Sequence, residues 1–310
     1  MRIVICEFMD SDAVAQLTAR FDVRYDKALV DRPDDLARGL ADADALIVRN
    51  RTSVDATLIA CAPRLRVVGR LGVGLDNIDV DACAARGIEI IPATGANALA
   101  VAEYVIATAM LLLRGAYQTT SDVAAGNWPR AALSNGREMA GKTIGIIGFG
   151  GIGRLTGRLA RSLGMQAIGF DPQVPPASPI WTDDQTLPRA LADVISQADV
   201  VSLHVPLVPA TRNLIDAADI ATMKAEAILI NTSRGGVVDE IAVAAALRAR
   251  KLGGAALDVF EREPLPAGSP LAGCPNLVLT PHIAGLTRES NRRVSELVAA
   301  KVAAALAPAR

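Results

Sequence analysis

The glycine-rich stretch GFGGIGR, residues 148–154, follows the apolar segment TIGII and opens the helical segment GRLTGRLARSLG. Its glycines Gly148, Gly150 and Gly153 match the spacing G-x-G-x-x-G. In a strand–loop–helix unit the first glycine permits a tight turn, the second lets the backbone approach a pyrophosphate, and the third lets helix and strand pack closely. The helix N-terminus then offers free N–H groups to the phosphates. In this context the stretch predicts a dinucleotide-binding loop, whereas the same spacing alone also occurs in ordinary turns.

An acid follows the loop at the expected distance. Asp171 ends the strand-like segment QAIGFDP, 18 residues after Gly153, and the dinucleotide fingerprint places an acid about 20 residues on. A carboxylate there accepts bonds from the ribose hydroxyls and repels a 2′-phosphate, so it favours NAD over NADP. The alternative is a turn residue before Pro172.

Strand-like and helical segments alternate along nearly the whole chain, which predicts an α/β protein. Short runs rich in Val and Ile suit strands buried on both faces of a parallel sheet. The expected strands are 2–8, 45–50, 65–72, 88–93, 142–150, 166–172, 199–207, 227–233, 254–260 and 276–282. Helical periodicity marks residues 11–21, with Ser11 as the expected N-cap, the apolar stretch 98–114, and a final helix over 288–306.

The chain length of 310 residues favours two domains. We expect a Rossmann-type doubly wound parallel sheet over 98–286. A smaller, flavodoxin-like α/β domain over 1–97 is completed by a C-terminal helical segment, 287–310, that packs back on it.

The composition excludes several classes of function. The net charge is −1, so no basic excess points to a nucleic acid or an acidic membrane. The longest apolar run, 104–113, has ten residues, whereas a membrane span needs about 20. The four cysteines form no C-x-x-C pair and no Cys/His cluster, which predicts reduced thiols, no metal site and a cytoplasmic protein.

A reaction on a hydroxyl or carbonyl group needs a residue that moves a proton. The sequence has two histidines, and both follow expected strands: His204 in VVSLHVPL and His282 in LTPHIAG. Loops at the carboxyl ends of such strands form the ligand crevice of an α/β sheet. Glu261 and Glu263 are both candidates for orienting His282, and the local pattern does not choose between them. Arg234 in NTSRGG is a candidate for binding a carboxylate as a fork.

Together these motifs resemble the D-isomer-specific 2-hydroxyacid dehydrogenase family over nearly the whole chain. The similar segments are GRLGVGLDNID (69–79), GKTIGIIGFGGIG (141–153), NTSRGGVVDE (231–240), LDVFEREP (257–264) and TPHIAG (280–285). The resemblance implies that Arg234 is the catalytic arginine and His282 the catalytic histidine. It also implies that Glu263, directly before a proline, is the acid rather than Glu261.

The resemblance further implies the ligand contacts. The substrate carboxylate would meet the backbone around Val73 and Gly74, together with Arg234 and His282. The resemblance places His204 near the cofactor and gives it no catalytic role. The implied NAD-binding residues are Gly148, Gly150, Gly151, Ile152, Gly153, Asp171, Val205, Pro206, Thr232, Ser233, Arg234, Asp258, His282 and Gly285.

The implied reaction interconverts a small 2-hydroxy acid and its 2-oxo acid. In oxidation His282 acts as general base while hydride passes to the nicotinamide, and Glu263 fixes which ring nitrogen faces the substrate. Arg234 would hold the carboxylate and polarise the carbonyl oxygen.

The substrate's far end is less defined by the sequence. IVRNRTSV (47–54) resembles a family segment whose first arginine, here Arg49, reaches that end, and Arg51 is an additional cation. Two cations suit a dianionic tail, as in 3-phosphoglycerate or 3-sulfolactate. The alternative is that one arginine forms a salt bridge and the other is solvated.

Within the family the chain resembles the phosphoglycerate dehydrogenases through both core domains and ends at residue 310. We therefore expect the short form, without a C-terminal regulatory domain or serine feedback. The alternatives are a glyoxylate or hydroxypyruvate reductase, a formate or phosphite dehydrogenase, and an NAD-sensing co-repressor that uses the fold as a binding module. Glutamate at 263 argues against formate dehydrogenase. Relatives pair through the long apolar helix, here AVAEYVIATAMLLL (100–113), so we expect a homodimer.

Overall fold

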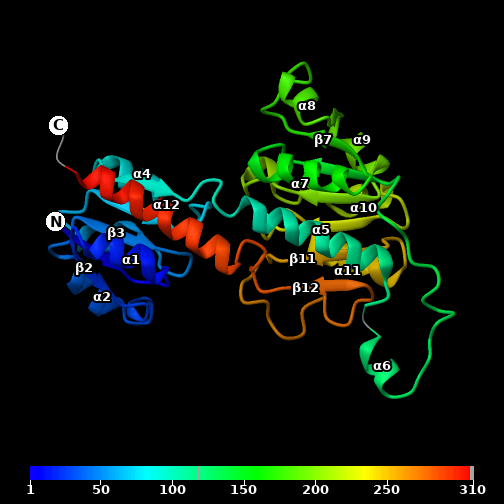
Figure 1. Ribbon diagram of the computed structural model, residues 1–310, viewed down its shortest axis with the longest axis horizontal. Helices are drawn as coiled ribbons and strands as arrows, with labels where there is room; N and C mark the ends of the chain where they lie inside the picture. Colours follow the sequence, from blue (N-terminus) through cyan, green and yellow to red (C-terminus); the bar gives the residue numbers. More distant parts are fainter. Residues whose placement is uncertain (118, 308–310) are drawn as a thin grey trace. The chain divides into compact units, whose positions relative to one another are not determined.

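The computed structural model describes residues 1–117 and 119–307. They form two compact units, the first comprising Met1–Asn97 and the segment from Leu286 onward, the second comprising Ala98–Gly285. Each unit is a parallel sheet covered by helices on both faces (Figure 1). The predicted two-domain α/β fold is therefore confirmed. Within the described residues, no helix is both long and apolar enough to cross a membrane.

The first unit has the flavodoxin-like strand order β2-β1-β3-β4-β5, with every neighbouring pair parallel. Helices α1 and α12 pack on one face, and α2, α3 and α4 lie on the other. The strands are β1 (Arg2–Ile5), β2 (Asp22–Tyr25), β3 (Ala45–Val48), β4 (Val67–Arg70) and β5 (Glu89–Pro92). The helices are α1 (Ser11–Thr18), η1 (Leu29–Asp31), α2 (Pro33–Leu40), α3 (Ala56–Ala60), α4 (Val80–Ala85) and α12 (Arg288–Leu306).

Two local features of this unit differ from the sequence prediction. Strand β2, with the sequence DVRY, was missed because it is an edge strand with partly exposed residues and so lacks an apolar run. The expected N-cap at Ser11 is wrong by one residue: the carboxylate of Asp10 accepts the N–H of Asp12 at 3.1 Å. Ser11 is the first residue of α1.

The second unit contains a parallel sheet of order β12-β11-β10-β9-β6-β7-β8. The order reverses at β6, which has β7 on one side and β9 on the other, so the switch point of a doubly wound sheet lies between β6 and β9. Its strands are β6 (Thr143–Ile147), β7 (Gln166–Phe170), β8 (Leu187–Pro188), β9 (Val200–Leu203), β10 (Ile228–Asn231), β11 (Gly254–Leu257) and β12 (Leu277–Leu279).

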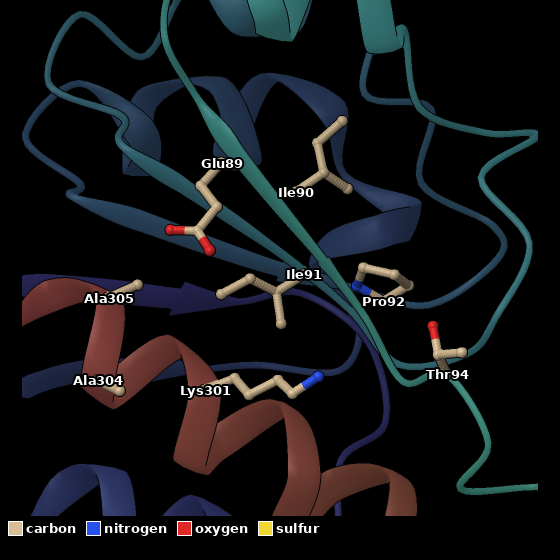
Figure 2. A pocket seen from close by; sticks show the side chains of 8 residues that line it. All are labelled: Glu89, Ile90, Ile91, Pro92, Thr94, Lys301, Ala304 and Ala305. Atoms are coloured by element: carbon tan, nitrogen blue, oxygen red, sulfur yellow. The ribbon is translucent and has the colours of Figure 1, made fainter.

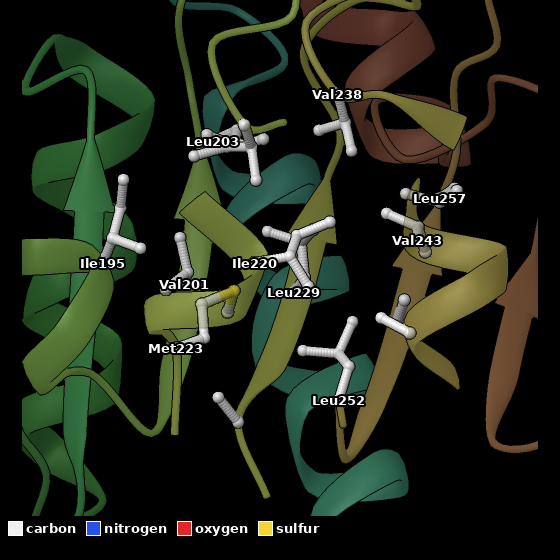
Figure 3. Close-up of a cluster of buried hydrophobic side chains, with 14 of the residues drawn as sticks. Ile195, Val201, Leu203, Ile220, Met223, Leu229, Val238, Val243, Leu252 and Leu257 are labelled. Atoms are coloured by element: carbon white, nitrogen blue, oxygen red, sulfur yellow. The ribbon is translucent and has the colours of Figure 1, made fainter. Parts of the chain in front are cut away.

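The helices of this unit cover both faces of its sheet. Buried side chains of α5 and α7 pack on one face, and those of α9, α10 and α11 pack on the other, where Figure 3 shows part of the core. The helices are α5 (Ala98–Arg114), α6 (Thr120–Ala124), α7 (Gly151–Ser162), α8 (Pro179–Asp183), α9 (Leu191–Gln197), η2 (Pro209–Thr211), α10 (Ala217–Thr222) and α11 (Glu240–Arg248). This packing leaves the loops at the carboxyl ends of the strands to form a site.

A surface pocket of about 390 Å³ lies in the first unit between the edge strand β5 and helix α12 (Figure 2). Its lining residues are Glu89, Ile90, Ile91, Pro92, Thr94, Lys301, Ala304 and Ala305. None of the predicted site residues is among them, so this pocket is separate from the candidate site.

Candidate functional site

The glycine loop lies at the switch point of the second sheet. Gly148 has φ +94°, and a Cβ added to it would lie 2.5 Å from the carbonyl oxygen of His204, so both its conformation and its surroundings require glycine. A Cβ on Gly153 would clash with the carbonyl oxygen of Gly148. The loop after β6 therefore contacts the segment after β9, which carries Val205 and Pro206, and helix α7 begins within the loop at Gly151.

Asp171 follows β7 and is bonded to this loop. One carboxylate oxygen accepts the N–H of Phe149 at 2.7 Å, and the other accepts the N–H of Gln173 at 2.8 Å. Asp171 therefore stabilises a turn, which was the alternative role given for it in the sequence analysis. A carboxylate has about four acceptor positions, so the same group keeps capacity for ribose hydroxyls.

The turn that carries Arg234 begins where β10 ends and is held by an amide side chain. The carbonyl of the Asn231 side chain accepts the N–H and hydroxyl of Ser233 at 3.0 and 2.7 Å, and its amino group donates to the backbone oxygen of Arg234 at 2.9 Å. A Cβ on Gly235 would clash with the carbonyl oxygen of Phe260. The Arg234 turn therefore packs directly against the segment that leads to Glu263.

His282 and Glu263 form a pair. Nδ1 of His282 lies 2.8 Å from one carboxylate oxygen of Glu263, and the other oxygen accepts the N–H of Phe260 at 3.1 Å. Because an ionised carboxylate can only accept, Nδ1 is the protonated ring nitrogen and Nε2 is left to exchange a proton with a ligand. Glu261 instead places its side chain within 3.7 Å of Arg212, so the pairing favours Glu263 over Glu261.

The backbone of His282 has φ +56°, a left-handed conformation that is uncommon outside glycine. The segment is held by the buried Asp258 at the end of β11. The Asp258 carboxylate accepts the N–H groups of Ile283 and Ala284, each at 2.8 Å, and the Asp258 carbonyl accepts the N–H of His282 at 2.8 Å. Thr280 donates its hydroxyl to the same carboxylate at 2.6 Å. Sequence reasoning missed Thr280, although it directly precedes the PHIAG motif.

His204 has a different environment. Its Nε2 lies 2.9 Å from the hydroxyl of Ser202, and burial lowers the pKa of His204 to about 4. The imidazole is therefore neutral near pH 7. Its backbone carbonyl packs against Gly148, which supports a structural role beside the glycine loop rather than proton transfer.

The residues of this unit suit a dinucleotide. The start of α7 offers backbone N–H groups for phosphates. The Thr232 hydroxyl is buried and has no hydrogen-bond partner within residues 1–117 and 119–307, so a ligand can supply one. One carboxylate oxygen of Asp258 accepts the N–H of Ala284 and can accept a further hydrogen bond, for example from the carboxamide of a nicotinamide.

In the first unit Arg49 and Arg51 follow β3 and have different surroundings. Arg49 is partly buried, its guanidinium donates to the Asn291 side-chain oxygen at 2.7 Å, and burial lowers its pKa. The exposed guanidinium of Arg51 pairs with Asp31. The buried carboxylate of Glu7 accepts the backbone N–H groups of Arg49 and Arg51 at 2.8 and 3.2 Å, which fixes this turn. The structure thus gives the two arginines different environments, with Arg49 bonded to Asn291 and Arg51 paired with Asp31.

The loop predicted to meet a substrate carboxylate lies between β4 and α4, with Val73 exposed and Gly74 partly exposed. The Asn77 side chain in this loop donates to the backbone oxygens of Arg49 and Thr52 at 3.2 and 2.6 Å. The two candidate substrate-binding segments of this unit are therefore bonded to each other.

Comparison with known proteins agrees with this geometry. Residues 106–284 match the family described as D-isomer specific 2-hydroxyacid dehydrogenase, NAD binding domain. The chain is 54% identical to the (S)-sulfolactate dehydrogenase of Chromohalobacter salexigens over 98% of each chain. It is 38% identical to the D-3-phosphoglycerate dehydrogenase of Mycobacterium leprae over 98% of this chain but only 57% of that protein. The crystal structure of the TT0316 protein from Thermus thermophilus superimposes with a TM-score of 0.89 and 32% identity, covering 99% of this chain and 97% of that one.

The match to the family covers more than half of the chain, and the relatives align along almost all of it. The resemblance predicted from the motifs is confirmed. The chain belongs to the D-isomer specific 2-hydroxyacid dehydrogenases and is an NAD-binding oxidoreductase of that family.

Proposed function

We propose that this enzyme interconverts (S)-sulfolactate and 3-sulfopyruvate with NAD. The observation that carries the choice of substrate is the 54% identity to an (S)-sulfolactate dehydrogenase over nearly the full length of both chains. The partly buried guanidinium of Arg49 supports it, because a substrate with a sulfonate needs a second cation beyond the one that binds its carboxylate.

The reaction breaks two bonds to hydrogen. In oxidation the C2 hydrogen of sulfolactate leaves as a hydride, the hydroxyl proton moves to Nε2 of His282, and the C2–O bond becomes a carbonyl. The bound nicotinamide supplies the hydride acceptor. Glu263 holds Nδ1 of His282 and stabilises the imidazolium that forms. In reduction His282 returns the proton.

We assign the remaining roles to residues of both units. Arg234 binds the substrate carboxylate together with backbone N–H groups near Val73 and Gly74, and Arg49 binds the sulfonate. The unit formed by Met1–Asn97 and the segment from Leu286 onward is then the substrate domain. The loops after β6, β7, β9, β10, β11 and β12 hold NAD through Gly148, Gly150, Gly151, Ile152, Gly153, Asp171, Val205, Pro206, Thr232, Ser233, Asp258 and Gly285.

A substrate panel tests the function. The purified protein is assayed with NADH and 3-sulfopyruvate, 3-phosphohydroxypyruvate, hydroxypyruvate, pyruvate and glyoxylate, and in reverse with NAD and (S)- and (R)-sulfolactate. We expect the highest kcat/KM with 3-sulfopyruvate and oxidation of the (S) isomer. Preference for 3-phosphohydroxypyruvate, hydroxypyruvate or glyoxylate would assign the enzyme to that acid instead. NADH binding without turnover of any acid would favour the co-repressor alternative.

We also propose a cytoplasmic homodimer. The four cysteines are free thiols, as a reducing compartment maintains. Most apolar side chains of α5 are buried against the sheet of their own unit, but Leu99 and Met110 on α5 and Tyr117, Val123 and Trp128 after it are exposed, and a second copy of the chain can cover them.

A further inference from the structure

A chain of hydroxyl groups leads from helix α5 to the segment that carries His282. The phenol oxygen of Tyr104 lies 2.6 Å from the hydroxyl of Thr280, which in turn lies 2.6 Å from a carboxylate oxygen of Asp258. All of these residues belong to the NAD-binding unit. Tyr104 is part of α5, the apolar helix for which the sequence analysis predicted no role in the site.

The direction of this chain follows from counting protons. An ionised carboxylate only accepts, so the single hydroxyl proton of Thr280 is donated to Asp258. Thr280 can then only accept from Tyr104, whose phenol must donate. Burial raises the pKa of Tyr104, which keeps this proton in place over the working pH range. The hydrogen bonds therefore run from Tyr104 to Thr280 to Asp258.

The carboxylate of Asp258, at the end of this series of hydrogen bonds, fixes the segment that carries His282. The oxygen that receives the Thr280 hydroxyl also accepts the N–H of Ile283, and the other oxygen accepts the N–H of Ala284. A left-handed residue such as His282 persists only where its surroundings hold it in place. A rotation of the Asp258 carboxylate would release the two N–H groups that follow His282.

We propose that Tyr104 and Thr280 are positioning residues: through Asp258 they hold His282 at the place where it exchanges a proton with the substrate. This rests on the proposed role of His282. Misplacement of a reacting group by about 1 Å can reduce a rate on the order of 100-fold. Thr280 contacts Asp258 directly and Tyr104 acts only through Thr280, so removal of the Thr280 hydroxyl has the larger effect.

The experiment uses variants that preserve shape. Thr280→Val and Tyr104→Phe remove one hydroxyl each, and Thr280→Ser restores the hydroxyl without the methyl group. The matched control is Thr108→Val on α5, the helix of Tyr104, because among the described residues the buried Thr108 hydroxyl donates to the helix backbone at Tyr104 and Val105. Each purified variant is measured for kcat, KM, the NADH dissociation constant and Tm.

We expect kcat to fall about 10- to 100-fold in Thr280→Val and about 3- to 10-fold in Tyr104→Phe, with Thr280→Ser and Thr108→Val within about twofold of wild type. The double variant Tyr104→Phe/Thr280→Val should match Thr280→Val alone, since both changes interrupt one chain. Equal losses in Thr280→Val and Thr280→Ser, or losses that multiply in the double variant, would overturn the proposal.

A second readout is independent of turnover and of the choice of substrate. Hydrogen–deuterium exchange of the peptide covering 280–286 reports on the N–H groups held by Asp258. We expect this exchange to accelerate about tenfold or more in Thr280→Val and to remain unchanged in Thr108→Val. Unchanged exchange in Thr280→Val refutes the proposal even if the substrate assignment is correct. Accelerated exchange supports it even if another 2-oxo acid is the substrate.

Discussion

The two histidines of the NAD-binding unit have opposite chemical situations. His282 pairs with Glu263 and presents its other ring nitrogen, whereas the pKa of His204 is lowered by burial to about 4. Replacing a positioned acid–base residue costs about 10²- to 10⁴-fold in rate, or roughly 3–5 kcal/mol of barrier. We therefore expect His282→Ala to lose kcat on that scale while its NADH affinity, measured by fluorescence titration, stays close to wild type. His204→Gln should lose far less kcat than His282→Ala. A larger loss in His204→Gln would mean that His204 is the acid–base residue.

His204 also predicts a pH dependence of stability. Its pKa is about 4 in the folded state, below the ordinary value of 6.5, so between these values the unfolded chain takes up a proton that the folded chain excludes. This contribution leaves stability intact above pH 6.5 and lowers the free energy of unfolding between pH 6.5 and about pH 4, by at most about 1.4 kcal/mol per pH unit. Urea unfolding at pH 7.5 and 5.5 should show a smaller acid-induced loss in His204→Gln than in wild type. Equal losses would mean that His204 is protonated in the folded state.

We expect Asp171 to determine the preference between NAD and NADP. Its carboxylate already accepts two backbone N–H groups, and its negative charge opposes a 2′-phosphate nearby. We expect kcat/KM with NADH to exceed that with NADPH, and Asp171→Ala to narrow the ratio. The ratio of kcat/KM with NADH to kcat/KM with NADPH is the quantity to compare. Loss of the Asp171 carboxylate also loosens the glycine loop, and this reduces kcat/KM with both cofactors. A wild-type enzyme equally efficient with both cofactors would contradict this role.

At the scale of elements, the turn after β3 places Arg49 and Arg51 in different surroundings. Glu7 holds the backbone of both, but Arg49 is partly buried beside Asn291 and Arg51 pairs with Asp31 at the surface. A charged hydrogen bond contributes roughly 1.5–3 kcal/mol, or about ten- to a hundredfold in efficiency. We expect Arg49→Ala to lose that much kcat/KM with 3-sulfopyruvate and much less with glyoxylate, which has no tail. Arg51→Ala serves as the control. If Arg49→Ala loses similar activity with 3-sulfopyruvate and with glyoxylate, Arg49 supports the structure of the loop and does not bind the sulfonate.

The elements that the sequence predicted are those with a strong local signal. Buried strands such as β3 and β10 read as unbroken apolar runs, and the apolar helix at 98–114 has the predicted bounds. Strand β2 was missed because its side chains are partly exposed. The glycine loop and the His282 motif are local patterns, so sequence could name them. Asn291 and Tyr104 are separated from their partners by 242 and 176 residues, and no local pattern reports such contacts.

At the scale of the whole molecule, the chain passes from the first unit to the second at Ala98 and returns at Leu286. Helix α12 thus packs beside α1, and its Ser295 hydroxyl accepts the N–H of Asp10 at 3.0 Å. The first unit therefore needs the last segment of the chain to cover one face of its sheet. Its own strands and helices up to Asn97 would leave the side chains that pack against Val298 and Val302 exposed.

The exposed apolar side chains of the NAD-binding unit bear on the oligomeric state. Large apolar side chains are exposed on α5 and the segment after it, including Met110 and, more strongly, Tyr117 and Trp128, which are 62% and 76% exposed. Exposed apolar side chains of this size are common at subunit interfaces, and we propose that a second copy of the chain covers them. We expect light scattering at micromolar concentration to give twice the 32.3 kDa mass of the chain.

Two variants locate this interface. Trp128→Glu places a charge on the exposed apolar surface and should shift the protein toward the monomer at low micromolar concentration, because a buried unpaired charge is costly. Ile241→Glu is the matched control, since Ile241 is 68% exposed on α11, outside that surface, and should leave the dimer intact. Two results would each contradict the assignment: a wild-type protein that scatters as a monomer, or a dimer that Ile241→Glu disrupts and Trp128→Glu preserves.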